Sequence, residues 1–246
     1  MTTGPVGCVL QPTFMPWLGW FDIVDQCDVL VILDDVGFSK QSWQQRNRIR
    51  GAGGLEILSV PVWTAGLLGQ PIDAVELADP RFEARTLGRV RGNYCKAPHF
   101  AELFPEFEDA VREGVARGRL IDVNMSIIRW AMSKLGLETS IVTSRTLDVP
   151  GMRGEKVAAL GAVMGMRTYL SPAGASDYLA EDVASFDRRG IDVRIQSYEH
   201  PAYRQQFEPF LSHASIVDLL FNEGPESAAI MRSGRCDSLA LPRMEE

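Results

Sequence analysis

Short apolar runs alternate along this chain with longer segments whose apolar residues recur every three or four positions. The short runs predict buried strands, and the longer segments predict helices. The clearest helix covers residues 121–136, where Ile127, Ile128, Ala131 and Leu135 share one face and Gly136 follows as a stop signal. The predicted strands are 6–10, 29–33, 55–60, 140–143, 168–170 and 192–195, and the predicted helices are 17–26, 80–92, 100–117, 121–136, 154–164 and a C-terminal helical part that begins at 215.

This alternation predicts an α/β fold: a mostly parallel sheet flanked by helices, with a helical C-terminal part. The chain has 246 residues, a length that fits one large domain. We expect residues 1–235 to form a single α/β domain and residues 236–246 to form a frayed tail.

Composition narrows the class of protein. The chain is 46% hydrophobic and 23% charged, with a net charge of −7, which is typical of a globular protein and argues against nucleic-acid binding. No lysine or arginine precedes the first apolar run, as a signal peptide would require, and no apolar stretch approaches the ~20 residues of a membrane span. The four cysteines form no CxxC pair, so no zinc spacing is present. We therefore expect a cytoplasmic protein with reduced thiols and neither a metal nor a cofactor.

The stretch QPTFMPWLGWFD follows the first predicted strand. Pro12 and Pro16 prevent regular strand pairing, so the chain must turn here into a loop and then a helix. Ligands of open parallel sheets bind outside the carboxyl ends of the strands. Gln11, Pro12 and Trp17 are therefore candidates for a binding site, although the aromatic residues that follow, Trp20 and Phe21, could equally belong to the core.

The segment LDDVGFSKQSWQQRNRIR, residues 33–50, combines acids, bases and amides. Asp34 and Asp35 follow a predicted strand and are candidate catalytic residues. Adjacent carboxylates can act as a base or hold a metal, but this pair alone is too little to assign a metal. Interleaved arginines and amides suit a phosphate or carboxylate ligand, and the alternative is a solvated loop whose charges balance one another. The candidate binding residues of this segment are Lys40, Trp43, Arg46, Asn47 and Arg48.

Two further segments carry chemically capable residues. In NYCKAPHF, residues 93–100, Cys95 and His99 offer a thiol and an imidazole, but the signal for a nucleophile and base is weak. The loops after the predicted strands 168–170 and 192–195 contain polar and aromatic side chains. These side chains could line a pocket or could belong to surface loops packed on the sheet. The candidates from these segments are His99 and His200 as catalytic groups, and Tyr94, Lys96, Ser171, Asp177 and Tyr178 as binding residues.

At these motifs the chain resembles the WbqC-like protein family. The matching pieces are QPTFMPWLGWFD, CDVLVILDDVGFSKQSWQQRNRIR, SVPV, YCKAPHF, YLSPAGASDYL and SIVDLLFNEGPES, in that order from residue 11 to about 228. Two positions depart from the family pattern. Leu10 stands where members often carry a histidine before Gln-Pro, and Gln45-Arg46-Asn47 replaces the frequent QNRN. Cys95 is not part of the pattern.

The resemblance implies a role in O-antigen, amino-sugar or specialised-metabolite assembly, where such proteins are suspected of attaching an acyl or aminoacyl group to an amine. We therefore expect an N-acyl or aminoacyl transferase that takes its acyl group from a thioester, with an acyl or peptidyl carrier protein as partner and an amine of an amino sugar or small metabolite as acceptor. Asp34 or Asp35 would be the base, and Arg46 and Arg48 would hold a phosphate. A non-catalytic binder of a nucleotide-sugar or carrier-bound intermediate is the alternative, and a thiol hydrolase using Cys95 is a weaker one.

Overall fold

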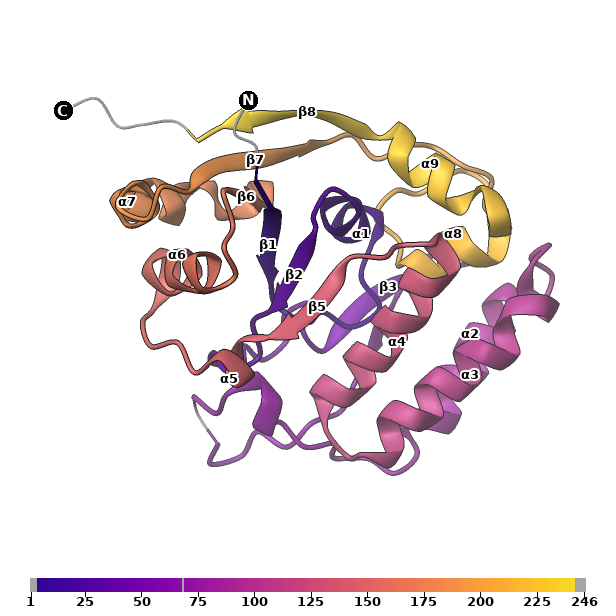
Figure 1. Ribbon diagram of the computed structural model, residues 1–246. Helices are drawn as coiled ribbons and strands as arrows, with labels where there is room; N and C mark the ends of the chain where they lie inside the picture. The colour runs from indigo at the N-terminus through magenta and orange to yellow at the C-terminus, as the bar shows by residue number, and fades with distance from the viewer. Residues whose placement is uncertain (1–3, 68, 242–246) are drawn as a thin grey trace.

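A six-stranded sheet forms the centre of the molecule (Figure 1). The protein is described from a computed structural model, which covers residues 4–67 and 69–241. The strands lie in the order β5-β2-β1-β6-β7-β8, and all neighbours are parallel except β7 and β8. Their bounds are β1 Val6–Leu10, β2 Val29–Ile32, β5 Ser140–Thr143, β6 Thr168–Ser171, β7 Asp192–Tyr198 and β8 Arg235–Ala240.

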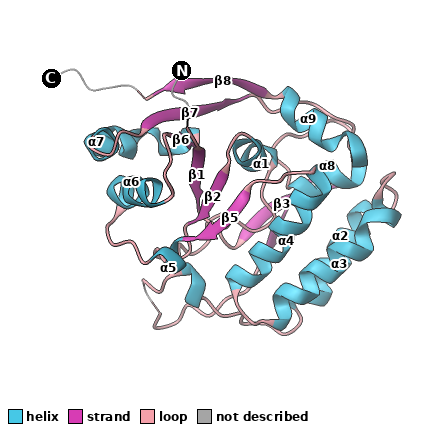
Figure 2. Ribbon diagram, viewed as in Figure 1, coloured by secondary structure: helices cyan, strands magenta, loops and turns pink. Residues whose placement is uncertain are grey.

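Helices cover both faces of this sheet (Figure 2). The helices are α1 Leu18–Asp25, α2 Phe82–Tyr94, α3 Phe100–Ala116, α4 Leu120–Leu135, α5 Ser144–Leu147, α6 Arg153–Val163, α7 Ser176–Asp187, α8 Ile216–Glu223 and α9 Ser227–Ser233. Short 3₁₀ turns add Ile72–Ala74, Ala173–Ala175 and Gly224–Glu226. The predicted α/β class, with its mostly parallel sheet and C-terminal helices, is confirmed.

The two faces of the sheet bury two separate cores because side chains alternate along a strand. In β2, Leu30 and Ile32 pack into the larger core together with α1, α3, α4 and α8. Val29 and Val31 point the other way, into a smaller core closed by α6 and α7. The apolar residues of β1 divide in the same manner. These strands therefore read as continuous apolar runs, as expected of parallel strands buried on both faces.

The basic segment after Asp35 contains a strand that sequence analysis missed. Residues 55–60 were predicted as a strand, and this strand, β4 (Gly54–Ser59), pairs antiparallel with β3 (Arg46–Gly51) in a separate two-stranded sheet. The alternation of arginines with Asn47 and Ile49 produces β3: these two residues are buried, whereas Arg46 and Arg48 are half-buried. Because of its charged arginines, the sequence of this segment indicates a loop and not a strand.

The C-terminal residues also differ from expectation. Residues 236–240, predicted as the start of a frayed tail, belong to β8, which pairs antiparallel with β7 at the edge of the sheet. The sequence RCDSLA carries little apolar signal because an edge strand exposes much of its surface, and Leu239 is 60% exposed. Among the described residues, no helix is long and apolar enough to cross a membrane.

Phe221 is the centre of an aromatic cluster that joins α8 to α3 and α4. Its ring lies 5.3 Å from Phe100, 5.9 Å from Phe107 and 6.2 Å from Trp130, measured between ring centroids, and the side chain is fully buried. We expect Phe221→Ala to lower the free energy of unfolding by about 3–5 kcal/mol, because it removes a ring and leaves a cavity. Urea unfolding monitored by circular dichroism measures this loss. The control, Leu239→Ala at an exposed position, should change it by less than about 0.5 kcal/mol; equal losses would contradict the central role of Phe221.

Candidate functional site

The strand order reverses at β1, and this reversal opens a crevice. The chain passes from β1 to β2 on one side and later returns to β6 on the other, which is the topological switch point where open α/β sheets bind ligands. β1 pairs with β6 only at Val6 and Gly7, so the two strands have separated before their carboxyl ends. A hollow of about 440 Å³ lies there, and Leu10, Gln11 and Pro172 are in its lining.

Two further hollows adjoin this central one and extend it into a groove along the carboxyl edge of the sheet. The charged hollow, of about 540 Å³, shares Gln11, Leu33 and Val157 with the central hollow. The aromatic hollow, of about 300 Å³, shares Thr13, Trp20 and Trp43 with it. We call the three together the carboxyl-end groove. Its combined size suits an extended small-molecule substrate.

Asp34 and Asp35 lie beside the charged hollow, in a network that joins the ends of β2 and β5. Ser144 Oγ donates to the carboxylates, 3.0 Å from Asp34 Oδ1 and 2.6 Å from Asp35 Oδ1. The backbone N–H of Arg145 donates to Asp34 Oδ1 at 3.0 Å. Lys156 Nζ lies 2.6 Å from Asp35 Oδ2. Asp34 is buried by this network, whereas Asp35 and Lys156 form an ion pair at the wall of the hollow.

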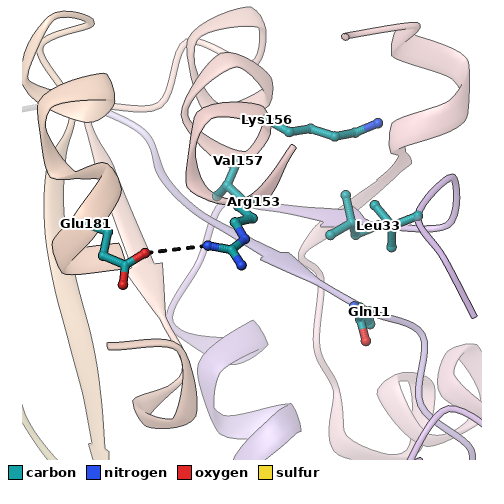
Figure 3. Close-up of a pocket in the computed structure, with 7 residues that line it drawn as sticks. Gln11, Leu33, Arg153, Lys156, Val157 and Glu181 are labelled. Carbon is teal, nitrogen blue, oxygen red and sulfur yellow. Dashed lines mark hydrogen bonds and ion pairs between the residues drawn. The ribbon is translucent and has the colours of Figure 1, made fainter. Parts of the chain in front are cut away.

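The ion pair fixes the charge states that the groove presents. Burial raises the pKa of Asp35, but hydrogen bonds from Lys156 and Ser144, together with the charge of Lys156, outweigh that effect and hold the pKa below its ordinary value. Asp35 is therefore an ionised carboxylate at neutral pH. Lys156 is itself buried, yet it lines the charged hollow with Gln11 and with Arg153 and Glu181, whose side chains lie 3.5 Å apart (Figure 3).

Gln11 presents a hydrogen-bond donor, and its neighbours determine its orientation. The backbone N–H of Ser39 donates to Gln44 Oε1 at 2.9 Å, so the Nε2 of Gln44 must face the other way. That Nε2 donates to Gln11 Oε1 at 2.9 Å. The amide nitrogen of Gln11 makes no such contact within the described structure, and Gln11 is exposed to the groove. Gln11 thus offers N–H groups to a ligand.

The aromatic hollow gathers indole, imidazole and guanidinium groups. Trp17 stacks on His213, with ring centroids 5.1 Å apart, and on His200, at 5.9 Å. Trp43 is 45% exposed, and the guanidinium carbon of Arg48 lies 5.0 Å from the centre of its ring. The corresponding distance for Arg46 is 5.9 Å. Three predicted binding residues from two separate sequence segments, Trp17, Trp43 and Arg48, therefore meet in one hollow.

His200 contacts two side chains of this hollow, Trp17 and His213, but is not part of its lining. Its Nδ1 is 2.9 Å from the carbonyl oxygen of Pro201, so Nδ1 carries the proton and donates it. Burial lowers the pKa of His200, and the neighbouring His213 lowers it further, so the ring is neutral at pH 7. Its Nε2 is buried and has no hydrogen-bond partner among the described residues. His200 thus packs against Trp17, and its predicted catalytic role stays a prediction.

Several predicted residues support the groove through their own hydrogen bonds. Asn47 donates from Nδ2 to the carbonyl oxygens of Phe14 and Met15, and its Oδ1 accepts from the backbone N–H of Arg48. Pro12 is buried, and Ser171 Oγ donates to a neighbouring carbonyl at the end of β6. The polar atoms of Asn47 are thus used inside the protein.

Other predicted residues do not reach the groove. Tyr94 is buried, and its hydroxyl accepts from the backbone N–H of Arg50 at 2.8 Å. His99 lies at the start of α3, 3.9 Å from the carboxylate of Glu102. Lys40 and Lys96 are exposed and are absent from the lining of the groove. The side chains of Asp177 and Tyr178, in the first turn of α7, lie outside the described residues.

Sequence analysis missed several groove residues because no local pattern marks them. Ser144 and Lys156 look like an ordinary helix start and an ordinary helix lysine, and only the topology brings them to Asp35. The sequence marks His213 only by its place after Ser212 in a polar loop. In the structure its φ is 63°, which is unusual for a residue other than glycine. Among the described residues, no cluster of three or more carboxylate, imidazole or thiol groups is arranged to hold a metal ion.

The Lys156–Asp35 pair yields a pH-dependent prediction. The pKa of Asp35 is lower in the folded than in the unfolded protein, so the pair adds stability above the unfolded pKa of about 3.9 and loses it as the pH falls through the folded pKa. We expect Lys156→Gln to lower the free energy of unfolding by about 1–2 kcal/mol at pH 7, because the pair is only partly screened by solvent.

This deficit relative to the unmutated protein should shrink when urea unfolding is repeated at pH 3. Lys40→Gln, which changes an exposed lysine outside the groove, is the matched control and should have little effect at either pH. A deficit in Lys156→Gln that is the same at both pH values would mean that the lysine stabilises the fold by packing and not by its charge.

Comparison with known proteins agrees with the sequence motifs. Residues 11–230 match the WbqC-like protein family. The uncharacterized protein Rv1507c of Mycobacterium tuberculosis is 30% identical over 230 residues, which cover 91% of this chain and 96% of that protein. No solved structure matches the chain. The match spans the groove and both cores, and the chain belongs to the WbqC-like protein family.

Proposed function

We propose that this protein is an N-acyl or aminoacyl transferase, which moves an acyl group from a carrier-protein thioester to the amine of an amino sugar or a small metabolite. The observation that carries the proposal is the charged hollow, whose lining includes Gln11, with amide N–H groups that are free within the described structure, and Lys156, whose Nζ is paired with the ionised carboxylate of Asp35. Aminolysis of a thioester needs these groups: donors for the developing oxyanion and an acceptor for the proton of the amine.

The reaction would begin when the amine nitrogen attacks the thioester carbonyl carbon and forms a C–N bond. Negative charge then develops on the carbonyl oxygen, where Lys156 and Gln11 can stabilise it. The C–S bond breaks next, and its electron pair leaves with the sulfur. The amine loses one proton, which Asp35 accepts and which finally goes to the departing thiolate. Atoms and charge balance without an oxidant or a further co-reactant.

The shape of the groove supports the same proposal. A carrier-bound acyl group arrives on a long flexible arm, and the three adjoining hollows offer an extended channel to receive it. The charged hollow would take the acyl end and the amine. Ser144 holds the Asp35 carboxylate, and Asp35 in turn holds Lys156, so these groups need little reorganisation when charge develops.

Gln11→Ala tests the proposal with small structural cost, because Gln11 is exposed. Purified protein is incubated with glycyl and acyl carrier-protein thioesters and with amino-sugar nucleotides, and the intact masses of the carrier and the small molecules are followed together. We expect the acyl mass to leave the carrier and to appear on an amine. Gln11→Ala should lower kcat by about 10²–10³-fold, the usual effect of removing one oxyanion donor.

Lys96→Gln is the matched control, since this exposed lysine lies outside the groove. Lys96→Gln should transfer the acyl group at the rate of the unmutated protein. Asp35→Asn should fold but transfer the acyl group more slowly. If no acyl mass moves while one of these compounds raises the melting temperature, the protein binds such an intermediate without turning it over, and catalysis on this donor class is refuted; a ligand at one hundred times Kd adds about 2.7 kcal/mol of stability.

A further inference from the structure

The aromatic hollow combines two features that no step of the proposed transfer uses. Trp43 presents an indole that is 45% exposed, Trp17 adds a half-buried indole, and the buried Trp20 also contributes to the lining. Beside these rings lie Arg46 and Arg48, and neither guanidinium forms an ion pair with a carboxylate within the described part of the chain. Arg48 lines the hollow, and Arg46 lies beside the same Trp43 ring. In a protein with a net charge of −7, two guanidiniums that lack an ion pair among the described residues form a local positive site at this place.

We propose that the aromatic hollow binds a nucleoside diphosphate group, with the base against the indoles and the phosphates on Arg46 and Arg48. Stacking on tryptophan requires a planar ring, and every nucleobase has a π-face. A guanidinium offers several N–H donors that match phosphate oxygens. Since Arg48 already contacts the Trp43 ring at 5.0 Å, one hollow presents both chemistries at adjacent positions.

The volume and the backbone support this assignment. About 300 Å³ suffices for a nucleobase and part of its ribose, while the phosphates would extend toward the arginines of β3. The side chains of the hollow are held in place: Asn47 is fixed by its hydrogen bonds to the loop that contains Phe14 and Met15, and the backbone N–H of Ser215 donates to the carbonyl of Arg48 at 2.7 Å. His213 keeps its left-handed φ and stacks on Trp17. A preorganised slot binds a rigid ring with little further loss of entropy.

A nucleoside diphosphate occurs in one acceptor of the proposed reaction, a nucleotide-linked amino sugar. Coenzyme A also contains one, although the proposed acyl donor is a carrier-protein thioester. The assignment of the ligand to a substrate rests on the proposed function. The central hollow shares lining residues with both the aromatic and the charged hollow, so a ligand bound in the aromatic hollow would lie near the proposed reaction site. Binding of a nucleoside diphosphate does not depend on acyl transfer. An experiment can therefore refute nucleotide binding and acyl transfer separately.

Equilibrium titration of the whole protein tests the slot, with intrinsic tryptophan fluorescence and calorimetry as readouts. The probes are uridine diphosphate, adenosine diphosphate, coenzyme A, phosphopantetheine and inorganic pyrophosphate. We expect the nucleoside diphosphates to bind and to quench fluorescence, and pyrophosphate to bind at least tenfold more weakly because it lacks a ring. Tighter binding of uridine diphosphate would indicate the nucleotide-linked amino sugar as the source of the nucleoside diphosphate, and tighter binding of coenzyme A would indicate a coenzyme A thioester as donor in place of the carrier-bound one.

Two variants and a matched control test whether Trp43 and Arg48 bind the nucleoside diphosphate. Trp43→Leu and Arg48→Gln should each raise the Kd of the preferred nucleoside diphosphate about tenfold or more. Arg48→Gln should also flatten the dependence of Kd on salt, because one phosphate contact is lost. Trp63→Leu removes an indole that is 54% exposed and lies outside the lining of the groove, so the Kd should not change.

The proposal is overturned if no nucleoside diphosphate binds, or if Trp43→Leu and Trp63→Leu have equal effects. It is also overturned if phosphopantetheine binds as tightly as coenzyme A, since no ring would then be needed. Acyl transfer without nucleotide binding would refute the slot alone. Nucleotide binding without transfer would support the slot and count against the transferase.

Discussion

The fold depends on how the opening loop, residues 11–17, satisfies its backbone. Two prolines prevent this loop from pairing as a strand, yet most of it is buried, so its carbonyl groups need other donors. Two buried asparagines supply them. Asn47 donates to Phe14 and Met15, and Asn124 donates to Pro12 at 3.0 Å and to a carbonyl of the neighbouring basic segment at 2.8 Å. Both hydrogens of each amide are used.

These amides connect parts of the chain that otherwise share few contacts. Asn124 lies on α4, Asn47 lies on β3, and the loop itself leads from β1 into α1. The backbone N–H of Ile216, at the start of α8, donates to the carbonyl of Pro16 at 2.8 Å. The opening loop thus fixes the sheet, the hairpin and two helices relative to one another. Because the same loop contributes Gln11, Thr13 and Trp17 to the groove, the groove has the rigidity of the core.

The sequence was informative wherever the physical cause is local. The apolar runs of β1 and β2, the α4 face with its Gly136 stop, and the two prolines predict elements that the structure contains. The position of Gln11 at the carboxyl end of β1 was also predictable, because parallel sheets place ligands there. Trp17, Trp43 and Arg48 were named as separate candidates, and the structure brings them into one hollow.

What the sequence could not predict depends on long-range pairing. Lys156 meets Asp35 across more than a hundred residues of chain, and a lysine in an amphipathic helix gives no sign of its partner. The strand β3 was hidden because its arginines resemble a solvated loop, although they alternate with buried Asn47 and Ile49. Tyr94 was named because it lies in a conspicuous motif, but its hydroxyl is engaged with the backbone of Arg50. In each case the tertiary partner decides what the residue does.

Backbone strain gives an independent reason to regard the groove as functional. Among the described residues other than glycine, positive φ angles occur at Met15, Gln41, Asp148, Arg153 and His213. Arg153 and His213 line the groove, and Met15 and Gln41 belong to the two loops that form its lip. Such conformations cost about 1–3 kcal/mol each and persist only where the surroundings enforce them. Stability alone does not explain why these strained residues lie at one edge of the sheet. A site that must hold Trp17, Gln11 and Lys156 in a fixed arrangement does explain it.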